Sequence, residues 1–201
     1  IKVNLENGVN LVSNFKSKFD FNKDLLSKYS KYLDKFALVK DFKNLKANLN
    51  NNLTISFDKT YKVEDYNYKI SGNIEKGNIK FKDPIKYVFL EKEIKSLQIS
   101  NLNLSSNIKK NEINFKAEGK YALNLSDFMS ISIENNSKND FENLILDFDF
   151  NESLQVDFIN YKKPKNSIAS ISLNFEKAKN TLTINGLQFQ EAKNLIKIKD
   201  L

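Results

Sequence analysis

The sequence predicts a mainly β protein built as a long antiparallel meander with one amphipathic helix, and three patterns support this prediction. Apolar and polar residues alternate through most of the 201 residues, most clearly over 111–125 (N-E-I-N-F-K-A-E-G-K-Y-A-L-N-L), as in strands with one apolar face. Short polar turns separate the alternating runs, as in sequential hairpins. Apolar spacings of three and four replace the alternation once, over 22–37.

The first part of the chain, residues 1–37, is predicted to contain two or three strands and then the helix. Asn7-Gly8 is a tight-turn pair between alternating runs. The helix near residues 22–37 is predicted to pack its apolar stripe on the sheet, with a lid over an open groove and a membrane-surface helix as alternatives. That stripe consists of Leu25, Leu26, Tyr29, Tyr32, Leu33 and Phe36.

Residues 43–85 return to a period of two. We expect the cluster Asn50–Asn52 to interrupt or bulge the first strand of this region. A second strand begins at Tyr66, and a hairpin turn is predicted at residues 75–78 because Gly77 and Asn78 are frequent in turns. Pro84 cannot donate to a strand ladder, so it is expected to end its strand or to mark an edge.

Residues 86–125 contain one ambiguous segment and one predicted irregularity. The pattern of 86–94 fits either a short helix or a strand. The apolar parity then changes between Ile99 and Leu102, which predicts a β-bulge if the same face stays buried. A turn at 109–111 leads into the long strand 111–125.

The second half of the chain is predicted to be a regular series of strands. Polar turns at 135–139, 151–153 and 177–180 separate them, and 161–165 is predicted to be a longer connection. The parity changes again at Gly186. The predicted strands cover residues 129–133, 144–150, 154–158, 169–175, 182–189 and 196–198.

Composition narrows the possible functions. The chain has no Cys and no His, so thiolate chemistry and the commonest general base and metal ligand are missing, and we expect neither an enzyme nor a cofactor or metal site. Its net charge is +7, and every cationic side chain is Lys. Because nucleic-acid-binding proteins depend on Arg for bidentate contacts, we expect no nucleic-acid partner. Codon bias is the simplest explanation of the basic charge.

The apolar face shared by successive strands is the predicted functional surface. Such a face must be covered, either by a second sheet, by closure into a barrel, or by an apolar ligand on an open sheet. Aliphatic and Phe side chains with no polar group among them suit long acyl chains. The predicted lipid-binding residues are Leu53, Ile55, Phe57, Ile113, Phe115, Tyr121, Leu123, Leu144, Leu146, Phe148, Val156, Phe158, Ile171, Leu173, Phe175, Leu182 and Ile184.

Two groups of charged residues have simpler explanations than a site. Asp147, Asp149 and Asp157 share the polar parity of neighbouring predicted strands, where oxygen ligands for a cation are an alternative to a solvated face. The lysines around Pro164 fit an ordinary charged loop, with lipid phosphate groups as an alternative partner.

The succession of strands resembles the AsmA-like proteins, and in particular the large members related to YhdP and TamB of Gram-negative bacteria. The segments that carry the resemblance are Y-N-Y-K-I-S-G-N-I (66–74), L-I-L-D-F-D-F (144–150), N-Y-K-K-P-K-N-S-I-A-S-I-S-L-N-F-E-K (160–177) and N-L-I-K-I-K-D-L (194–201). The similarity extends from about Phe42 to Leu201.

The resemblance implies a curved, groove-like sheet (a β-taco) that carries phospholipids between the inner and outer membranes in outer-membrane biogenesis. It implies a periplasmic location in the cell envelope, with an inner-membrane anchor outside this segment. Residues 1–201 are then expected to be a single β-rich segment, an internal fragment of a longer membrane-anchored protein. The alternative is a structural β-sandwich, or a solenoid spacer or adhesive domain, of an envelope protein.

Overall fold

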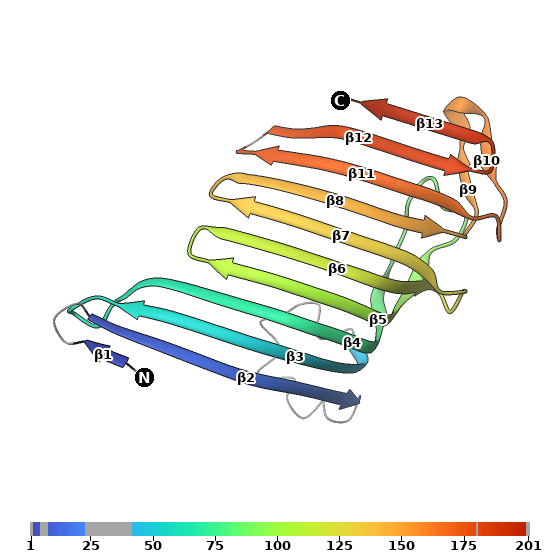
Figure 1. Ribbon diagram of the computed structural model, residues 1–201. Coiled ribbons are helices and arrows are strands. Elements are labelled where there is room, and N and C mark those ends of the chain that lie inside the picture. The colour runs from blue at the N-terminus through green and yellow to red at the C-terminus, as the bar shows by residue number, and fades with distance from the viewer. Residues whose placement is uncertain (1, 5–7, 23–41, 180, 200–201) are drawn as a thin grey trace.

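The computed structural model describes residues 2–4, 8–22, 42–179 and 181–199, and it is almost entirely antiparallel β-structure (Figure 1). Eleven strands form one sheet in the order β1-β2-β3-β4-β5-β6-β7-β8-β11-β12-β13, and β9 and β10 form a separate two-stranded sheet. The prediction of a long antiparallel meander is therefore confirmed. The elements are β1 (Lys2–Asn4), β2 (Gly8–Asn22), β3 (Phe42–Phe57), β4 (Val63–Ile85), β5 (Ile94–Lys109), β6 (Glu112–Leu123), β7 (Met129–Lys138), β8 (Phe141–Phe150), β9 (Leu154–Val156), the 3-10 turn η2 (Asp157–Ile159), β10 (Tyr161–Lys163), β11 (Ala169–Ala178), β12 (Thr181–Glu191) and β13 (Asn194–Lys199).

The predicted helix near residues 22–37 lies outside the described residues, apart from Asn22, which ends β2. β1 pairs antiparallel with β2, with Asn4 opposite Gly8. The turn predicted at Asn7-Gly8 lies outside the described residues, apart from Gly8, which begins β2. β4 ends at Ile85, directly after Pro84, as expected from the missing proline N–H. Of the ambiguous segment 86–94, Ile94 begins β5, and residues 86–93 form neither a helix nor a full strand. They form an irregular connection with one β-bridge, between Leu90 and Leu154.

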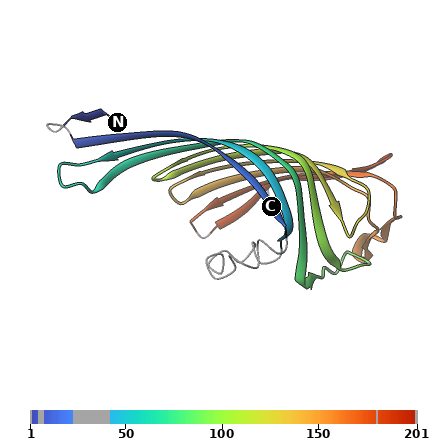
Figure 2. The same cartoon turned by 90° about the horizontal axis from the view of Figure 1, so that it is seen from below.

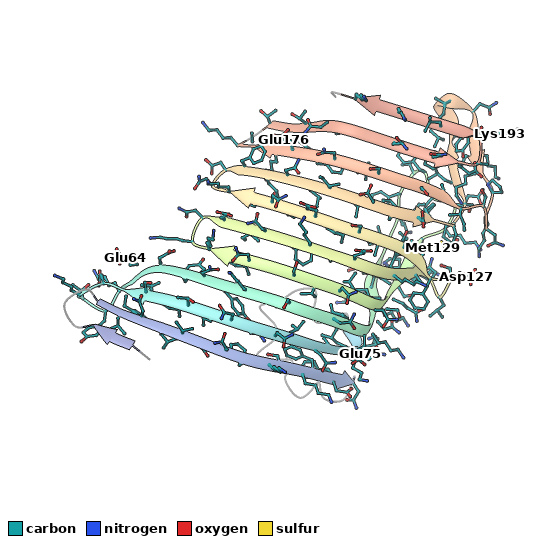
Figure 3. All side chains as sticks on the ribbon, viewed as in Figure 1. Glu64, Glu75, Asp127, Met129, Glu176 and Lys193 are labelled. Atoms are coloured by element: carbon teal, nitrogen blue, oxygen red, sulfur yellow. The ribbon has the colours of Figure 1, made fainter. Side chains whose placement is uncertain are left out.

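The two ends of the strands differ in their connections. At one end, which we call the turn end, short turns join β3 to β4, β5 to β6 and β7 to β8. At the other end, the loop end, β4 is followed by the segment 86–93, β6 by residues 124–128, and β8 by the segment that contains β9 and β10. Figure 3 shows Glu64 and Glu176 at the turn end, and Asp127, Met129 and Lys193 at the loop end.

Two β-bulges predicted from parity changes are confirmed. The pairing of β5 with β6 shifts between Ser100 and Asn103, and Asn101 adopts a positive φ of 50° there. The pairing of β11 with β12 shifts where Asn174 faces Gly186 and Phe175 faces Ile184, which leaves Asn185 as the extra residue. Each bulge returns the following apolar residues to the same face of the sheet.

The hairpin predicted at residues 75–78 is wrong. β4 runs through this segment without turning, and Gly77 pairs with Leu45 on one side and Ile99 on the other. Glu75 is the extra residue of a bulge against β3. Its carboxylate is held on the polar face, where it accepts a hydrogen bond from Asn48 Nδ2 at 2.6 Å and pairs with Lys46 Nζ at 2.6 Å. Long-range pairing on both sides therefore overrides the local turn signal.

The predicted interruption at Asn50–Asn52 is also wrong, because these residues stay in register with β2 and β4. The polar turn predicted at 135–139 is shorter than expected: β7 continues to Lys138, and the turn lies at Asn139 and Asp140. The turn at 109–111 is confirmed, with β5 ending at Lys109.

The sheet is a single layer over most of its area. The chain exposes 14032 Å² of accessible surface, whereas a compact monomer of 23.3 kDa exposes about 9,700 Å². In Figure 2 the long strands bend at the loop end, and the β9–β10 pair and the segment after β4 lie on the inner side of the bend. The continuous groove-like form of the sheet stays a prediction.

Candidate functional site

Strand register places apolar side chains in rows that cross the sheet. Residues that face each other in an antiparallel pair point to the same side, so the pairings trace each row from strand to strand. One row from β3 to β13 contains only aliphatic residues and glycine. It consists of Leu49, Gly72, Leu104, Ala117, Ile133, Leu146, Leu173, Leu187 and Ile198.

A second row lies beside the first, one residue pair closer to the loop end, and it is also apolar throughout. It consists of Ala47, Ile74, Leu102, Gly119, Ile131, Phe148, Ile171, Phe189 and Ile196. We call the two rows together the apolar band. At about 4.8 Å between strands, the band crosses roughly 38 Å of sheet.

The other face of the same strands is polar. Its rows contain Asn, Ser, Lys, Asp and Glu, joined by amide hydrogen bonds such as Asn73 Nδ2 to Asn103 Oδ1 at 2.9 Å and by ion pairs such as Lys116 Nζ to Glu134 Oε2 at 2.9 Å. The sheet is therefore amphipathic as a whole, with one solvated face.

The predicted lipid-binding residues lie on the face of the apolar band, with two exceptions. Leu146, Phe148, Ile171 and Leu173 belong to the band itself. The remaining members on this face flank the band on either side: Leu53, Ile55, Phe57, Ile113, Phe115, Tyr121, Leu123, Leu144, Phe175, Leu182 and Ile184.

The placement of Val156 and Phe158 in a strand of the main sheet is wrong. The chain leaves the sheet after β8, and Val156 pairs with Tyr161 in the β9–β10 sheet. Phe158 lies in the turn η2. β11 takes the place beside β8. The departure also separates Asp157 from Asp147 and Asp149, so the three carboxylates do not stand on neighbouring strands.

The β9–β10 pair covers the loop end of the apolar face. The Tyr161 ring meets the Phe189 ring edge-on, with centroids 5.6 Å apart. Lys163 Nζ lies 5.4 Å from the centroid of the Phe150 ring. The segment after β4 reaches the same place, where Gln155 N donates to Phe89 O at 3.0 Å and Lys162 Nζ pairs with Glu91 Oε1 at 2.8 Å. Together these segments form a wall along one side of the apolar band.

Two buried charged residues attach this wall to the sheet. Lys163 has no exposed surface, and its Nζ donates to the carbonyl oxygens of Glu152 at 2.8 Å and Pro164 at 3.2 Å. Burial lowers the pKa of Lys163. Glu191 is 6% exposed and accepts hydrogen bonds from the hydroxyls of Ser167 and Tyr161. These bonds, led by that from Ser167, lower the pKa of Glu191 below its ordinary value.

The attachment of the wall is expected to weaken in acid. Because the pKa of Glu191 is lower in the folded state, its stabilising contribution is complete above the ordinary value of 4.5 and is lost as the pH falls through the lowered value. The difference in free energy of unfolding between wild type and Glu191→Gln, measured by urea titration, should therefore be largest near pH 7 and shrink below pH 4.5. A difference that stays constant from pH 7 to pH 3 would contradict this assignment.

Sequence reasoning missed Asn51, a polar residue on the apolar face. Asn51 is 6% exposed, its Nδ2 donates to Ser17 Oγ at 3.0 Å, and its Oδ1 accepts from the Tyr68 hydroxyl at 2.7 Å. Asn51 has the same sequence parity as Leu49 and Leu53, and this parity was the signal that could have placed it on the apolar face. The predicted set also omitted Leu102 on β5, a strand that it did not sample, and Phe189 on β12, which follows the bulge at Asn185.

Among residues 2–4, 8–22, 42–179 and 181–199, no group of three His, Cys, Asp or Glu side chains is placed to hold a metal ion. In the same part of the chain, no helix has the length and apolar character needed to cross a membrane. The chain matches no protein-family model, no curated protein and no solved structure.

Proposed function

We propose that this chain is a non-enzymatic segment of a lipid-transfer groove, in which acyl chains of phospholipids lie against the apolar band. One observation carries the proposal: two adjacent rows of apolar side chains cross nine strands, and in the described residues the wall at the loop end is the only layer packed on that face. Hydrocarbon is the covering that such a surface favours, at about 0.8 kcal/mol for each buried CH₂ group.

The direction of the rows supports transfer as well as binding. They run across the strands from β3 to β13, so a chain lying along the band moves past equivalent side chains at every strand. The resemblance to the AsmA-like proteins supports a periplasmic location, with an inner-membrane anchor in a segment outside residues 1–201. Outer-membrane biogenesis is the process that such a groove would serve.

The alternative is a structural sandwich or solenoid spacer, in which a second sheet covers the apolar band. The surface of 14032 Å² disfavours a closed sandwich within this chain. A partner layer from another protein is then the competing occupant of the band.

The proposal is tested by extracting lipids from the purified chain, expressed in a Gram-negative periplasm, and identifying them by mass spectrometry. We expect phospholipid at a stoichiometry of at least one per chain, and transfer of fluorescent phospholipid from vesicles to the chain. A lipid-free chain that forms a stable dimer through the apolar face would support the sandwich instead.

A further inference from the structure

On the turn-end side of the band, the apolar face also carries polar and charged side chains. The neighbouring row there contains Asn51 on β3, Ser106 on β5 and Asn135 on β7, alternating with apolar residues on the strands between them. One residue pair further out, Ser137, Glu142 and Lys177 face one another across β7, β8 and β11. We call these six residues the polar margin.

The outer part of the polar margin combines both signs of charge. Glu142 and Lys177 are directly opposed on β8 and β11, and no ion pair between them is formed in the described structure. Glu142 Oε1 instead accepts a hydrogen bond from Asn135 Nδ2 at 2.8 Å. Ser137, Glu142 and Lys177 line a hollow of about 410 Å³ at this end of the strands, together with Asp140, Phe141 and Lys179.

On the opposite side of the band, the hollow beneath the wall, lined by Leu90, Leu123 and Phe150, holds only about 10 Å³. An open hollow of about 440 Å³ remains at the loop ends of β5 and β6. The wall of β9, β10 and the segment after β4 is packed on the sheet, with Tyr161 against Phe189 and Lys163 over Phe150. Over β8 and β12, where the wall is packed on the sheet, a molecule with both a hydrocarbon part and a polar part is therefore oriented with its polar part toward the turn end.

We infer that the polar margin receives the headgroup of a diacyl lipid while its acyl chains lie along the apolar band, and that the headgroup preferred is a zwitterion carrying a phosphate and an ammonium. This inference rests on the proposed function and deepens it. The Lys177 ammonium matches the phosphate. The Glu142 carboxylate and the Asn135 carbonyl, whose Oδ1 is buried without a hydrogen-bond partner, match the ammonium.

Orientation is tested with two photoreactive phosphoethanolamine lipids, one carrying the reactive group on the headgroup and one at the end of an acyl chain. Crosslinked residues are mapped by mass spectrometry. We expect the headgroup probe to label residues 135–142 and 177, and the acyl probe to label band residues such as Ile131 and Phe189. Headgroup labelling at the loop end, or equally at both ends, would overturn the inference and leave the proposed function standing. Absence of labelling by both probes would contradict the proposed function itself.

Headgroup preference is tested by competition between vesicles of phosphatidylcholine doped with either phosphatidylethanolamine or phosphatidylglycerol. We expect at least threefold more phosphatidylethanolamine taken up by the wild-type chain, and a preference reversed toward the anionic lipid in Glu142→Lys. The matched control is Glu176→Lys, which makes the same change of charge at the turn end but on the polar face, where Glu176 accepts from Asn185 Nδ2. If the wild-type chain, Glu142→Lys and Glu176→Lys all showed the same ratio of phosphatidylethanolamine to phosphatidylglycerol uptake, the proposed placement of the headgroup at the polar margin would be wrong.

Discussion

Replacing Leu146 by Asp is expected to reduce the phospholipid that co-purifies with the chain at least tenfold. Leu146 stands in the middle of the apolar band, between Ile133 and Leu173. A carboxylate there is placed against hydrocarbon, which costs several kcal/mol, and each 1.4 kcal/mol corresponds to a factor of ten in affinity. Asp is chosen because its side chain is too short to reach water beside the acyl chains.

The neighbouring residue supplies the control for this prediction. Ile145 is also aliphatic and half-buried, but it lies on the polar face, opposite Glu134 and Asn174. Ile145→Asp therefore introduces the same charge one residue away on the other side of the sheet. We expect it to retain the wild-type amount of lipid, with at most about 1 kcal/mol of destabilisation from the facing Glu134.

The measurement is the molar ratio of extracted phospholipid to protein, with the melting temperature of each variant as a check on folding. Equal loss of lipid in both variants would show that binding depends on the strand as a whole rather than on the apolar face. An unchanged ratio of phospholipid to protein in Leu146→Asp would show that the lipid does not bind to the apolar band.

The faces of the sheet were predictable because a period of two fixes which side chains share a side. Parity alone also located the bulges after Ser100 and at Asn185, since a change of parity with a single buried face requires an extra residue. The sequence did not locate the bulge at Glu75, where a parity change between Ile74 and Ile79 also fits a hairpin turn. Gly77 pairs with Leu45 of β3 and Ile99 of β5, which are distant in sequence, and this pairing selects the bulge over the hairpin turn.

The β9–β10 pair was not predictable for a related reason. Leu154 and Val156 alternate just as strand residues of the main sheet do, so their local pattern is the same in either place. Their position is decided by Tyr161 and Lys163, which pack on Phe189 and Phe150 of the main sheet. The apolar band was not predictable from the sequence either, because its rows can be traced only when the register of every strand is known.

Two glycines are expected to be essential for this register. A Cβ atom added at Gly72 would lie 2.1 Å from Asn48 O and 2.9 Å from Leu49 Cα, and one at Gly119 would lie 2.6 Å from Leu102 Cα and 2.7 Å from Asn101 O. All four contacts are to backbone atoms, which cannot move away without displacing a strand. We expect Gly72→Ala and Gly119→Ala each to lower the free energy of unfolding by about 2–4 kcal/mol.

Gly186 is the matched control, because it lies at a bulge of the same sheet but has no atom within 4 Å of an added Cβ. Gly186→Ala is expected to change the free energy of unfolding by less than about 0.5 kcal/mol. Urea titration followed by circular dichroism measures all three variants. Stability of Gly119→Ala equal to that of Gly186→Ala would mean that β5 and β6 are further apart at the bulge than described. Since Gly72 and Gly119 both lie in the apolar band, that result would also break the continuity of the surface on which acyl chains are proposed to lie.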